Sequence, residues 1–190
     1  MLAAGRSQRM GTQKLLLSVS GQPMLARIVD QVLTSPIDRV FVVTGADRHR
    51  LAAALAGRPV TFVVNADEQG EMLSSVRCGL AALPPECTAA LIVLGDLPGL
   101  TADVVARLLQ AFQTAGRGIV VPTSNGRRGH PLLVSLRYCD EILTCYEAVG
   151  LRGLLQAHPE EVHEVEVGTA RILEDVDTPL DFKRLADRGA

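Results

Sequence analysis

Basic residues are concentrated in a glycine-containing segment near the start of the sequence, MLAAGRSQRMGTQK. The segment holds two glycines, two arginines and a lysine, and it has no acidic residue. Backbone amides in a turn of this composition form a concavity that binds anions. Arg9 would bind phosphate oxygens through two parallel hydrogen bonds, and Lys14 would act as a compact point charge. The segment is a candidate triphosphate site, and a solvated basic tail is the alternative interpretation.

The spacing of this segment differs from two common phosphate-binding motifs. Gly11 is followed by Thr12 and Gln13 rather than by the Lys-Ser or Lys-Thr pair of a P-loop. The segment also lacks the G-x-G-x-x-G pattern of dinucleotide-binding folds. It therefore predicts a phosphate-binding loop of another kind.

Acidic residues that could hold a divalent cation follow an apolar run in the middle of the sequence. Asp96 lies in the stretch GDLP, directly after AALIVL. Magnesium usually takes one or two carboxylates together with phosphate oxygens and water, and ligands of open parallel sheets bind at the carboxyl ends of strands. A second acidic cluster, EDVDTPLD, contains Asp177. Capping of a turn or helix is the alternative role for both aspartates.

Two further segments carry polar side chains in loops. The stretch SNGRRGHP, residues 124–131, combines two arginines, two glycines and His130. It is suited to a second anion, such as the terminal phosphate of an acceptor, and a basic hairpin tip is the alternative. Residues 65–76 join a predicted strand to a helix. Ser74 and Ser75 could offer hydroxyls or amides to a ligand near the helix start, and an ordinary helix entry is the alternative.

Alternating strands and helices must bring these segments together. Strands are predicted at 39–44, 60–64 and 89–94, and helices at 47–56, 71–83 and 100–115, the last capped by Thr101. Continuous apolar strands separated by helices indicate an α/β fold with a mostly parallel sheet that is covered on both faces. We therefore expect Lys14 and Asp96 to converge on one crevice.

The pattern changes after residue 118. Two extended runs, GIVVPT and HPLLVS, flank a turn and predict a small antiparallel element. Helices are expected at 137–146 and 151–157, followed by a strand pair at 162–167 and 170–173. A last helix begins near Thr178 and Pro179, where proline suits the first turn.

Composition limits the classes of protein to which the chain can belong. Its 190 residues, 47% hydrophobic and 21% charged, indicate one globular domain over 1–190. A net charge of −2 argues against a general nucleic-acid or membrane-surface protein. Four cysteines without metal-binding spacing are expected to be free thiols, which suits a reducing cytoplasm. No apolar run is long enough for a membrane span and no signal peptide is evident, so a cytoplasmic location is expected.

The motifs as a group resemble one family of enzymes. LAAGRSQRMGTQKL resembles the nucleotide-binding signature of nucleotidyltransferases that attach a nucleoside monophosphate to molybdopterin. Together with G-D-x-P, D-x-D-T-P and N-G-x-x-G-H-P, it is most similar to the molybdenum cofactor cytidylyltransferase family. The resemblance implies a Rossmann-like three-layer sandwich. It also implies transfer of CMP from CTP to the terminal phosphate of molybdopterin, with release of pyrophosphate and formation of molybdopterin cytosine dinucleotide.

The resemblance also implies roles for individual residues. Arg9, Lys14 and Asp96 would be catalytic, and Asp96 and Asp177 would bind Mg²⁺. Acceptor binding would involve Gly129, His130 and Pro131. Nucleotide binding would involve Ala3, Ala4, Gly5, Arg9, Lys14, Asn65 and Ser75. Guanylyltransferase relatives typically have glycine at the position of Ala4, so the methyl group there favours CTP over the larger GTP.

Alternatives remain open at this point. A related nucleotidyltransferase could use GTP, or a sugar or polyol phosphate as acceptor. The protein could instead be a non-catalytic chaperone that carries molybdopterin to a molybdoenzyme. If it is a nucleotidyltransferase, a molybdoenzyme could still be a transient partner. No nucleic acid or membrane partner is expected. Only Met1 and Leu2 precede Ala3, whereas strands usually have five or six residues. The first central strand is therefore expected to be missing, with the true start upstream.

Overall fold

The computed structural model describes residues 1–190 except 6, 8–9, 68–70 and 188–190. Its helices are α1 (Met24–Leu33), α2 (Arg48–Ala54), α3 (Met72–Ala81), α4 (Ala102–Ala115), α5 (Cys139–Thr144), α6 (Arg152–Ala157) and α7 (Pro179–Asp187). Its strands are β1 (Leu2–Ala3), β2 (Ser18–Val19), β3 (Gln22–Pro23), β4 (Val40–Thr44), β5 (Val60–Val64), β6 (Ala89–Ile92), β7 (Ile119–Ser124), β8 (Arg127–Arg128), β9 (Leu132–Ser135) and β10 (Val162–Glu166). Short 3-10 helices cover Lys14–Leu16, Leu136–Tyr138, Pro159–Glu161 and Ala170–Leu173.

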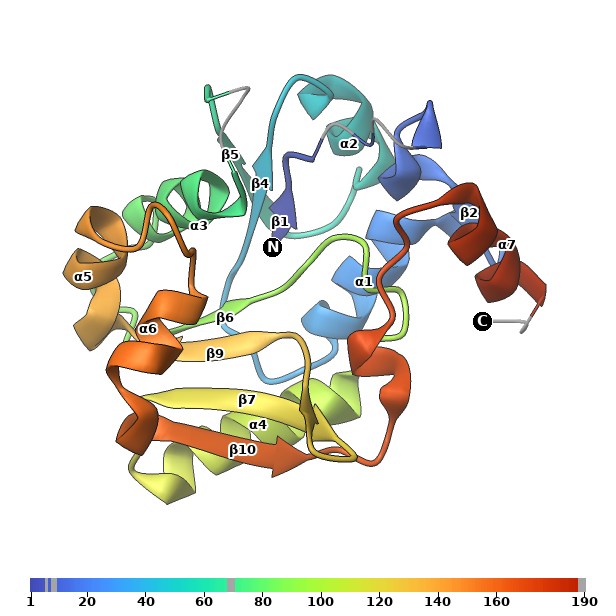
Figure 1. The fold of residues 1–190 in the computed structure, drawn as a ribbon. Helices are drawn as coiled ribbons and strands as arrows, with labels where there is room; N and C mark the ends of the chain where they lie inside the picture. The colour runs from blue at the N-terminus through green and yellow to red at the C-terminus, as the bar shows by residue number, and fades with distance from the viewer. Residues whose placement is uncertain (6, 8–9, 68–70, 188–190) are drawn as a thin grey trace.

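The described strands form three hydrogen-bonded groups: β2 and β3 are a separate antiparallel pair, and the two larger groups meet at β1 (Figure 1). The parallel group has the order β1-β4-β5, and the mixed group has the order β10-β7-β9-β6. A parallel bridge between Leu2 and Leu94 joins the groups, so the order across the molecule is β5-β4-β1-β6-β9-β7-β10. The carboxyl ends of β1, β4 and β6 therefore meet along one edge.

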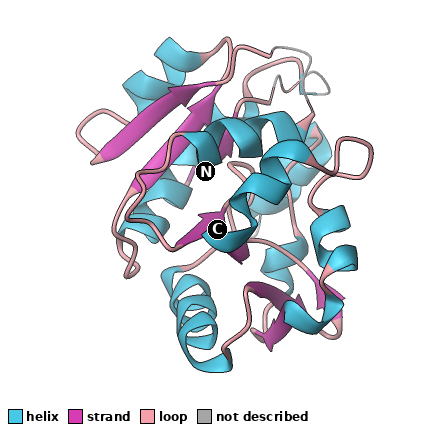
Figure 2. Cartoon of the chain, turned by 90° about the vertical axis from the view of Figure 1, so that its left-hand side faces the viewer, coloured by secondary structure: helices cyan, strands magenta, loops and turns pink. Residues whose placement is uncertain are grey.

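Helices cover both faces of this sheet, which confirms the α/β sandwich (Figures 1 and 2). Buried residues of α1 and α4 pack with Val120 on one face, whereas those of α3, α5 and α6 pack with Ile119 and Val121 on the other. Side chains alternate between the faces of a strand, and here both faces are apolar. The continuous apolar run of β7 follows from its burial on both sides.

Most predicted elements are present, and several parts of the fold differ from the prediction. Residues 170–173 form a 3-10 helix rather than a strand, and the partner of β10 is β7, to which it runs parallel. The helix predicted at 137–146 is interrupted, with α5 ending at Thr144. Helix α1 was not predicted, although its residues Met24, Leu25 and Ile28 are completely buried. The predicted cap of α4 is confirmed, because Thr101 Oγ1 accepts a hydrogen bond from the Val104 amide.

The first strand is short but not missing. The Leu2 amide donates to Val93 O at 2.8 Å, and Leu2 O accepts from the Gly95 amide at 2.9 Å. On the other side the Val43 amide donates to Met1 O at 2.9 Å. Two residues thus connect β4 to β6. A cavity of about 550 Å³ lies between β4 and β6, and Met1 is one of its lining residues.

The buried amino group of Met1 predicts a pH-dependent stability. It donates to Phe41 O at 2.7 Å, and burial lowers its pKa from 8.0 to about 5. Between these values only the unfolded chain holds the proton. The free energy of unfolding should therefore rise by about 3 kcal/mol from pH 5 to pH 8 in a chain with a free amine at Met1. Urea titrations at several pH values would measure this.

Acetylation of the Met1 amine provides the control. It removes the titrating group, so most of the pH dependence should disappear. A free-amine chain that is equally stable at pH 5 and pH 8 would contradict the prediction.

The described part of the chain contains no helix that is both long enough and apolar enough to cross a membrane.

Candidate functional site

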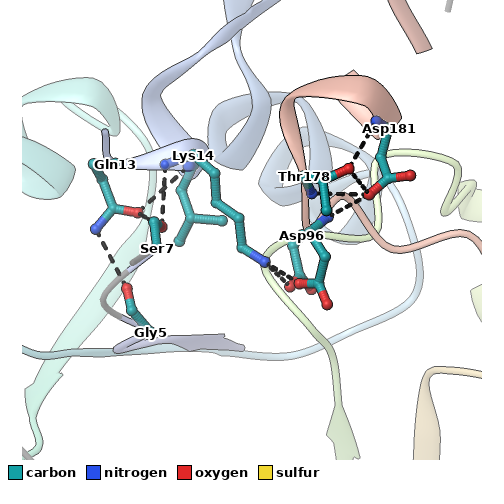
Figure 3. A network of polar contacts seen from close by, with 9 residues as sticks. Gly5, Ser7, Gln13, Lys14, Asp96, Thr178 and Asp181 are labelled. Atoms are coloured by element: carbon teal, nitrogen blue, oxygen red, sulfur yellow. Dashed lines mark hydrogen bonds and ion pairs between the residues drawn. The ribbon is translucent and has the colours of Figure 1, made fainter. Parts of the chain in front are cut away.

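Lys14, Asp96 and Asp177 meet at the carboxyl edge of the central strands. Lys14 Nζ lies 2.7 Å from Asp96 Oδ2 and 2.8 Å from Asp177 Oδ1. Figure 3 shows the lysine side chain extending from the first loop toward Asp96. The expected convergence of Lys14 and Asp96 is confirmed, although these residues are 82 positions apart in the sequence.

The position of Asp96 is set by Gly95, at the point where the chain leaves the sheet. The Gly95 amide is bonded to Leu2 O, and a Cβ on Gly95 would lie only 2.7 Å from that oxygen. Any side chain would therefore separate β1 from the Asp96 segment. Asp96 itself is connected to the last part of the chain through its carbonyl oxygen, which accepts from the Val176 amide at 3.0 Å.

Gln13 organises the first loop and was not predicted from the sequence. Its buried side chain donates to Asp47 Oδ2 at 2.8 Å, and its Oε1 accepts from Ser7 Oγ at 3.0 Å. Ser7 Oγ in turn accepts from the Lys14 amide at 3.1 Å (Figure 3). A buried glutamine must satisfy its amide, so this network fixes the backbone from which Lys14 projects. The sequence signal for this role was a glutamine adjacent to Lys14. Its partner Asp47 lies 34 residues away, so the hydrogen bond between them could not be recognised from the sequence.

Asp177 is held by a capping arrangement at the start of α7. Asp181 Oδ2 accepts from the Thr178 amide at 2.8 Å and from Thr178 Oγ1 at 2.7 Å, while the Asp181 amide donates to Thr178 Oγ1 at 3.2 Å. These hydrogen bonds to Thr178, together with one from the Asp177 amide, lower the Asp181 pKa. Thr178 therefore caps the helix, which leaves the Asp177 carboxylate directed at Lys14.

Lys14 is charged at neutral pH. Burial alone would lower its pKa, but hydrogen bonds from the ammonium to Asp177 and Asp96, and the charges of these carboxylates, raise the pKa above its usual value. Its side chain is 12% exposed, against 22% for Asp96 and 30% for Asp177. The carboxylate pair thus faces a cation in a partly shielded site.

The side chains of the site can hold a divalent metal only if a ligand supplies further oxygen atoms. Within the described ranges, no group of three or more His, Cys, Asp or Glu side chains could hold a metal ion. Two carboxylates, however, already surround one cationic nitrogen. Magnesium is commonly held by one or two carboxylates plus phosphate oxygens and water, so the donor set fits a metal that arrives with a polyphosphate.

Gly129, His130 and Pro131, the predicted acceptor segment, lie against Ile172, and the charge of Asp96 acts on His130. The His130 amide donates to Ile172 O at 3.0 Å, and a Cβ on Gly129 would lie 2.5 Å from the same oxygen. Burial lowers the His130 pKa, while the charges of Asp96 and Asp175 act to raise it and that of Arg152 acts to lower it. His130 Nδ1 is buried without a hydrogen-bond partner among the described residues. The predicted acceptor segment is therefore on the same side as Asp96.

The two arginines of this turn, which were predicted to bind an anion, lie on the surface of the protein. Arg127 and Arg128 are exposed, and Arg128 Nε donates to Glu164 Oε1 at 2.7 Å. Glu164 belongs to β10, so Arg128 is engaged along the sheet edge. Arg152, at the start of α6, is instead the basic residue whose charge acts on His130. It was not predicted, because nothing in its sequence surroundings marks it.

Asn65 and Ser75 form a second polar group at the carboxyl end of β5. Asn65 Nδ2 donates to Ser74 Oγ at 3.0 Å and to Ser75 Oγ at 3.1 Å. Asn65 and Ser75 are 8% and 7% exposed. These contacts fix the entry of α3 against β5, and the intervening residues 68–70 are outside the described part of the chain.

The remaining predicted residues belong to the start of the first loop. Ala3 is buried at the end of β1, Ala4 is half-buried, and Gly5 is exposed. The Ala4 carbonyl approaches Gly45, where a Cβ would lie 3.1 Å from the oxygen. The Gly5 carbonyl accepts from Gln13 Nε2 at 3.5 Å. Arg9 lies outside the described residues.

Comparison with known proteins gives one family match and several relatives. The family described as "MobA-like NTP transferase domain" matches residues 1–162. The molybdenum cofactor cytidylyltransferase of Escherichia coli K12 is 29% identical over 187 residues, which cover 98% of this chain and 93% of that enzyme. The bifunctional protein GlmU of Burkholderia orbicola is 32% identical over 175 residues, or 91% of this chain, and this chain spans only 37% of its length.

Solved structures show the same fold. The crystal structure of Rv0371c from Mycobacterium tuberculosis H37Rv has a TM-score of 0.87 and 28% identity, covering 98% of this chain and 95% of that one. A manganese complex of Rv0371C has a TM-score of 0.82 and 26% identity over 98% and 95% of the two chains.

Proposed function

The chain belongs to the MobA-like NTP transferase family and is a nucleotidyltransferase, and from this premise we propose that it transfers CMP from CTP to the terminal phosphate of molybdopterin. Pyrophosphate would be released, and molybdopterin cytosine dinucleotide would form. The similarity to the Escherichia coli cytidylyltransferase along nearly the whole chain supports this choice of substrates.

The observation that carries the proposal is the meeting of Lys14 with Asp96 and Asp177. Lys14 supplies a cation for phosphate oxygens, and the two aspartates supply carboxylates for a divalent metal. The three side chains meet at the carboxyl ends of parallel strands, where ligands of such sheets bind. The charge of Asp96 also acts on His130, which supports a place for His130 in the same site. One crevice would thus serve both the nucleotide and the acceptor.

The reaction requires positioning more than proton transfer. An oxygen of the molybdopterin phosphate would attack the α-phosphorus of CTP, forming a new P–O bond while the bond to the β-phosphate oxygen breaks. The attacking phosphate has a second pKa of about 6 and is largely ionised near pH 7, so no strong general base is needed. Catalysis would depend on orientation and on stabilisation of the charge that develops.

Basic residues of the first loop would stabilise the leaving pyrophosphate. Lys14 would bring its ammonium to the phosphate oxygens as charge accumulates on them, and Arg9 is proposed to bind the same chain of phosphates from the loop. Gln13 and Ser7 hold the backbone that presents Lys14. Backbone groups from Ala3 to Gly5, with Asn65 and Ser75, are proposed to border the base and ribose.

Asp96 and Asp177 would hold Mg²⁺, which when bound neutralises phosphate charge and polarises the α-phosphate. Manganese in the structure of the Mycobacterium tuberculosis protein supports the use of a divalent cation in this fold. His130 would orient the acceptor phosphate, and the lack of a side chain at Gly129 allows the backbone of this segment to lie against Ile172.

Nucleotide choice gives a testable prediction centred on Ala4. We expect kcat/KM for CTP to exceed that for GTP by about 10- to 200-fold, because the Ala4 methyl group narrows the space beside the base. The variant Ala4→Gly should reduce this ratio by admitting the purine. Turnover of the two nucleotides measured side by side would test both statements, and a preference for GTP in the unsubstituted chain would contradict them.

One assay separates the proposed reaction from its alternatives. Purified protein is incubated with molybdopterin, CTP and Mg²⁺, and pyrophosphate and the pterin product are both quantified. Formation of the cytosine dinucleotide supports the proposal. Turnover only with a sugar or polyol phosphate would indicate a different acceptor, and tight molybdopterin binding without turnover would indicate a carrier for a molybdoenzyme.

A further inference from the structure

The Lys14 ammonium has the surroundings expected of a bound metal ion. It lies between two carboxylates, 2.7 Å from Asp96 Oδ2 and 2.8 Å from Asp177 Oδ1. The two aspartates come from distant parts of the sequence, one after β6 and one before α7. Their common partner in this structure is a side chain that the proposed reaction needs at the phosphates.

We propose that in the nucleotide-free enzyme Lys14 occupies the divalent-cation position between Asp96 and Asp177, so that the metal enters together with a nucleotide whose phosphates draw the ammonium away. This inference rests on the proposed function, because it takes the two aspartates as the metal ligands. It adds an order of assembly: a polyphosphate is needed before the carboxylates become available.

The ammonium and the metal compete for the same carboxylate oxygens. Lys14 already uses one oxygen from each aspartate, and all three side chains are partly shielded from water. Charges of the same sign repel strongly at such short range when water does not screen them. Binding of a divalent cation therefore requires that the ammonium withdraw from at least one aspartate.

The structure allows Lys14 to withdraw without disturbing the loop. Its backbone amide donates a hydrogen bond to Ser7 Oγ, and the side chain of the next residue, Leu15, is buried in the core with 3% of its surface exposed. The lysine side chain has a flexible stem of four carbons. In Figure 3 the stem lies between Asp96 on one side and Ser7 and Gly5 of the phosphate loop on the other, so the ammonium can exchange carboxylates for phosphates.

This exchange couples metal and nucleotide binding. Without phosphates, moving the ammonium away from the aspartates leaves its charge without a close counter-ion. With phosphates present, the ammonium gains a new anionic partner while the metal takes over the carboxylates. Each ligand should then tighten the binding of the other by the same factor, and the charge of Lys14 should supply part of that factor.

The test measures Mn²⁺ binding without turnover. Mn²⁺ is titrated into the full chain and into Lys14→Met, and free Mn²⁺ is followed by electron paramagnetic resonance. In the absence of nucleotide, the variant should bind Mn²⁺ at least about tenfold more tightly, because the competing charge is gone. The gain in Mn²⁺ affinity on adding tripolyphosphate should be smaller in Lys14→Met than in the unsubstituted chain.

Matched variants identify the origin of any change. Lys183→Met removes an exposed lysine from α7 and should leave Mn²⁺ affinity unchanged, whereas adding Asp96→Asn to Lys14→Met should abolish the tight site. Lys14→Gln provides a second neutral side chain if the methionine variant does not fold. Equal or weaker Mn²⁺ binding by a folded Lys14 variant would overturn the inference.

The outcome is independent of the substrate assignment. Neither CTP nor molybdopterin is used, so failure of the proposed transfer reaction would leave the Mn²⁺ result intact. Conversely, the unsubstituted chain could transfer cytidylyl groups while Lys14→Met binds Mn²⁺ with unchanged affinity. That result would retain the proposed function and would show that the Lys14 ammonium does not compete with the metal.

Discussion

Replacement of Asp96 by alanine is expected to reduce turnover by about 100- to 1000-fold while the protein stays folded. The carboxylate lies 2.7 Å from Lys14 Nζ and would hold the metal at the α-phosphate. Its side chain is 22% exposed and lies outside the apolar core, so the substitution removes chemistry without opening a cavity. Pyrophosphate release under saturating CTP and molybdopterin measures the effect.

A charge-matched control separates this role from a general loss of negative charge. Asp103 on α4 is 68% exposed and pairs with Arg107, so Asp103→Ala should retain nearly full turnover. Circular dichroism should show both variants folded. Pyrophosphate release by Asp96→Ala at close to the rate of the unsubstituted protein would remove Asp96 from the mechanism.

Replacement of Lys14 by alanine should also lower turnover by about 100- to 1000-fold. The ammonium is proposed to bind phosphate oxygens more strongly as charge collects on the leaving pyrophosphate. An interaction made mainly in the transition state affects kcat, whereas loss of ground-state binding affects mainly KM. We therefore expect kcat to fall substantially, and steady-state kinetics over a range of CTP concentrations would measure both constants.

Lys183→Ala is the matched control for this substitution. Lys183 lies on the exposed surface of α7, so its removal should leave both constants unchanged. A Lys14→Ala enzyme with unchanged kcat and a raised KM would contradict the transition-state role and leave only a binding role.

The meeting of Lys14 with Asp96 could be predicted because it follows from a rule about parallel sheets. The apolar run before Asp96 identifies a buried strand, and the carboxyl ends of such strands share an edge with the loop that follows β1. Gln13 could not be assigned in this way. Its role depends on a hydrogen bond to Asp47, 34 residues away, and no local pattern reveals that contact.

Two errors in the predicted fold have a common physical origin. Ala170–Leu173 has the apolar character of a strand, but Ile172 O accepts from the His130 amide and the segment turns into a 3-10 helix. Leu2–Ala3 is too short to be predicted as a strand, yet it bonds to neighbours on both sides. In both cases long-range hydrogen bonds, rather than local propensity, determine the conformation.

The position of Asp177 after the last described strand has a consequence for synthesis of the protein. The last strand, β10, ends at Glu166, whereas the second carboxylate appears eleven residues later in the chain. Translation delivers Lys14 early and Asp177 late. A nascent or prematurely terminated polypeptide could thus assemble every strand and still have its ammonium paired with Asp96 alone. Such a product would lack the second carboxylate of the proposed metal site.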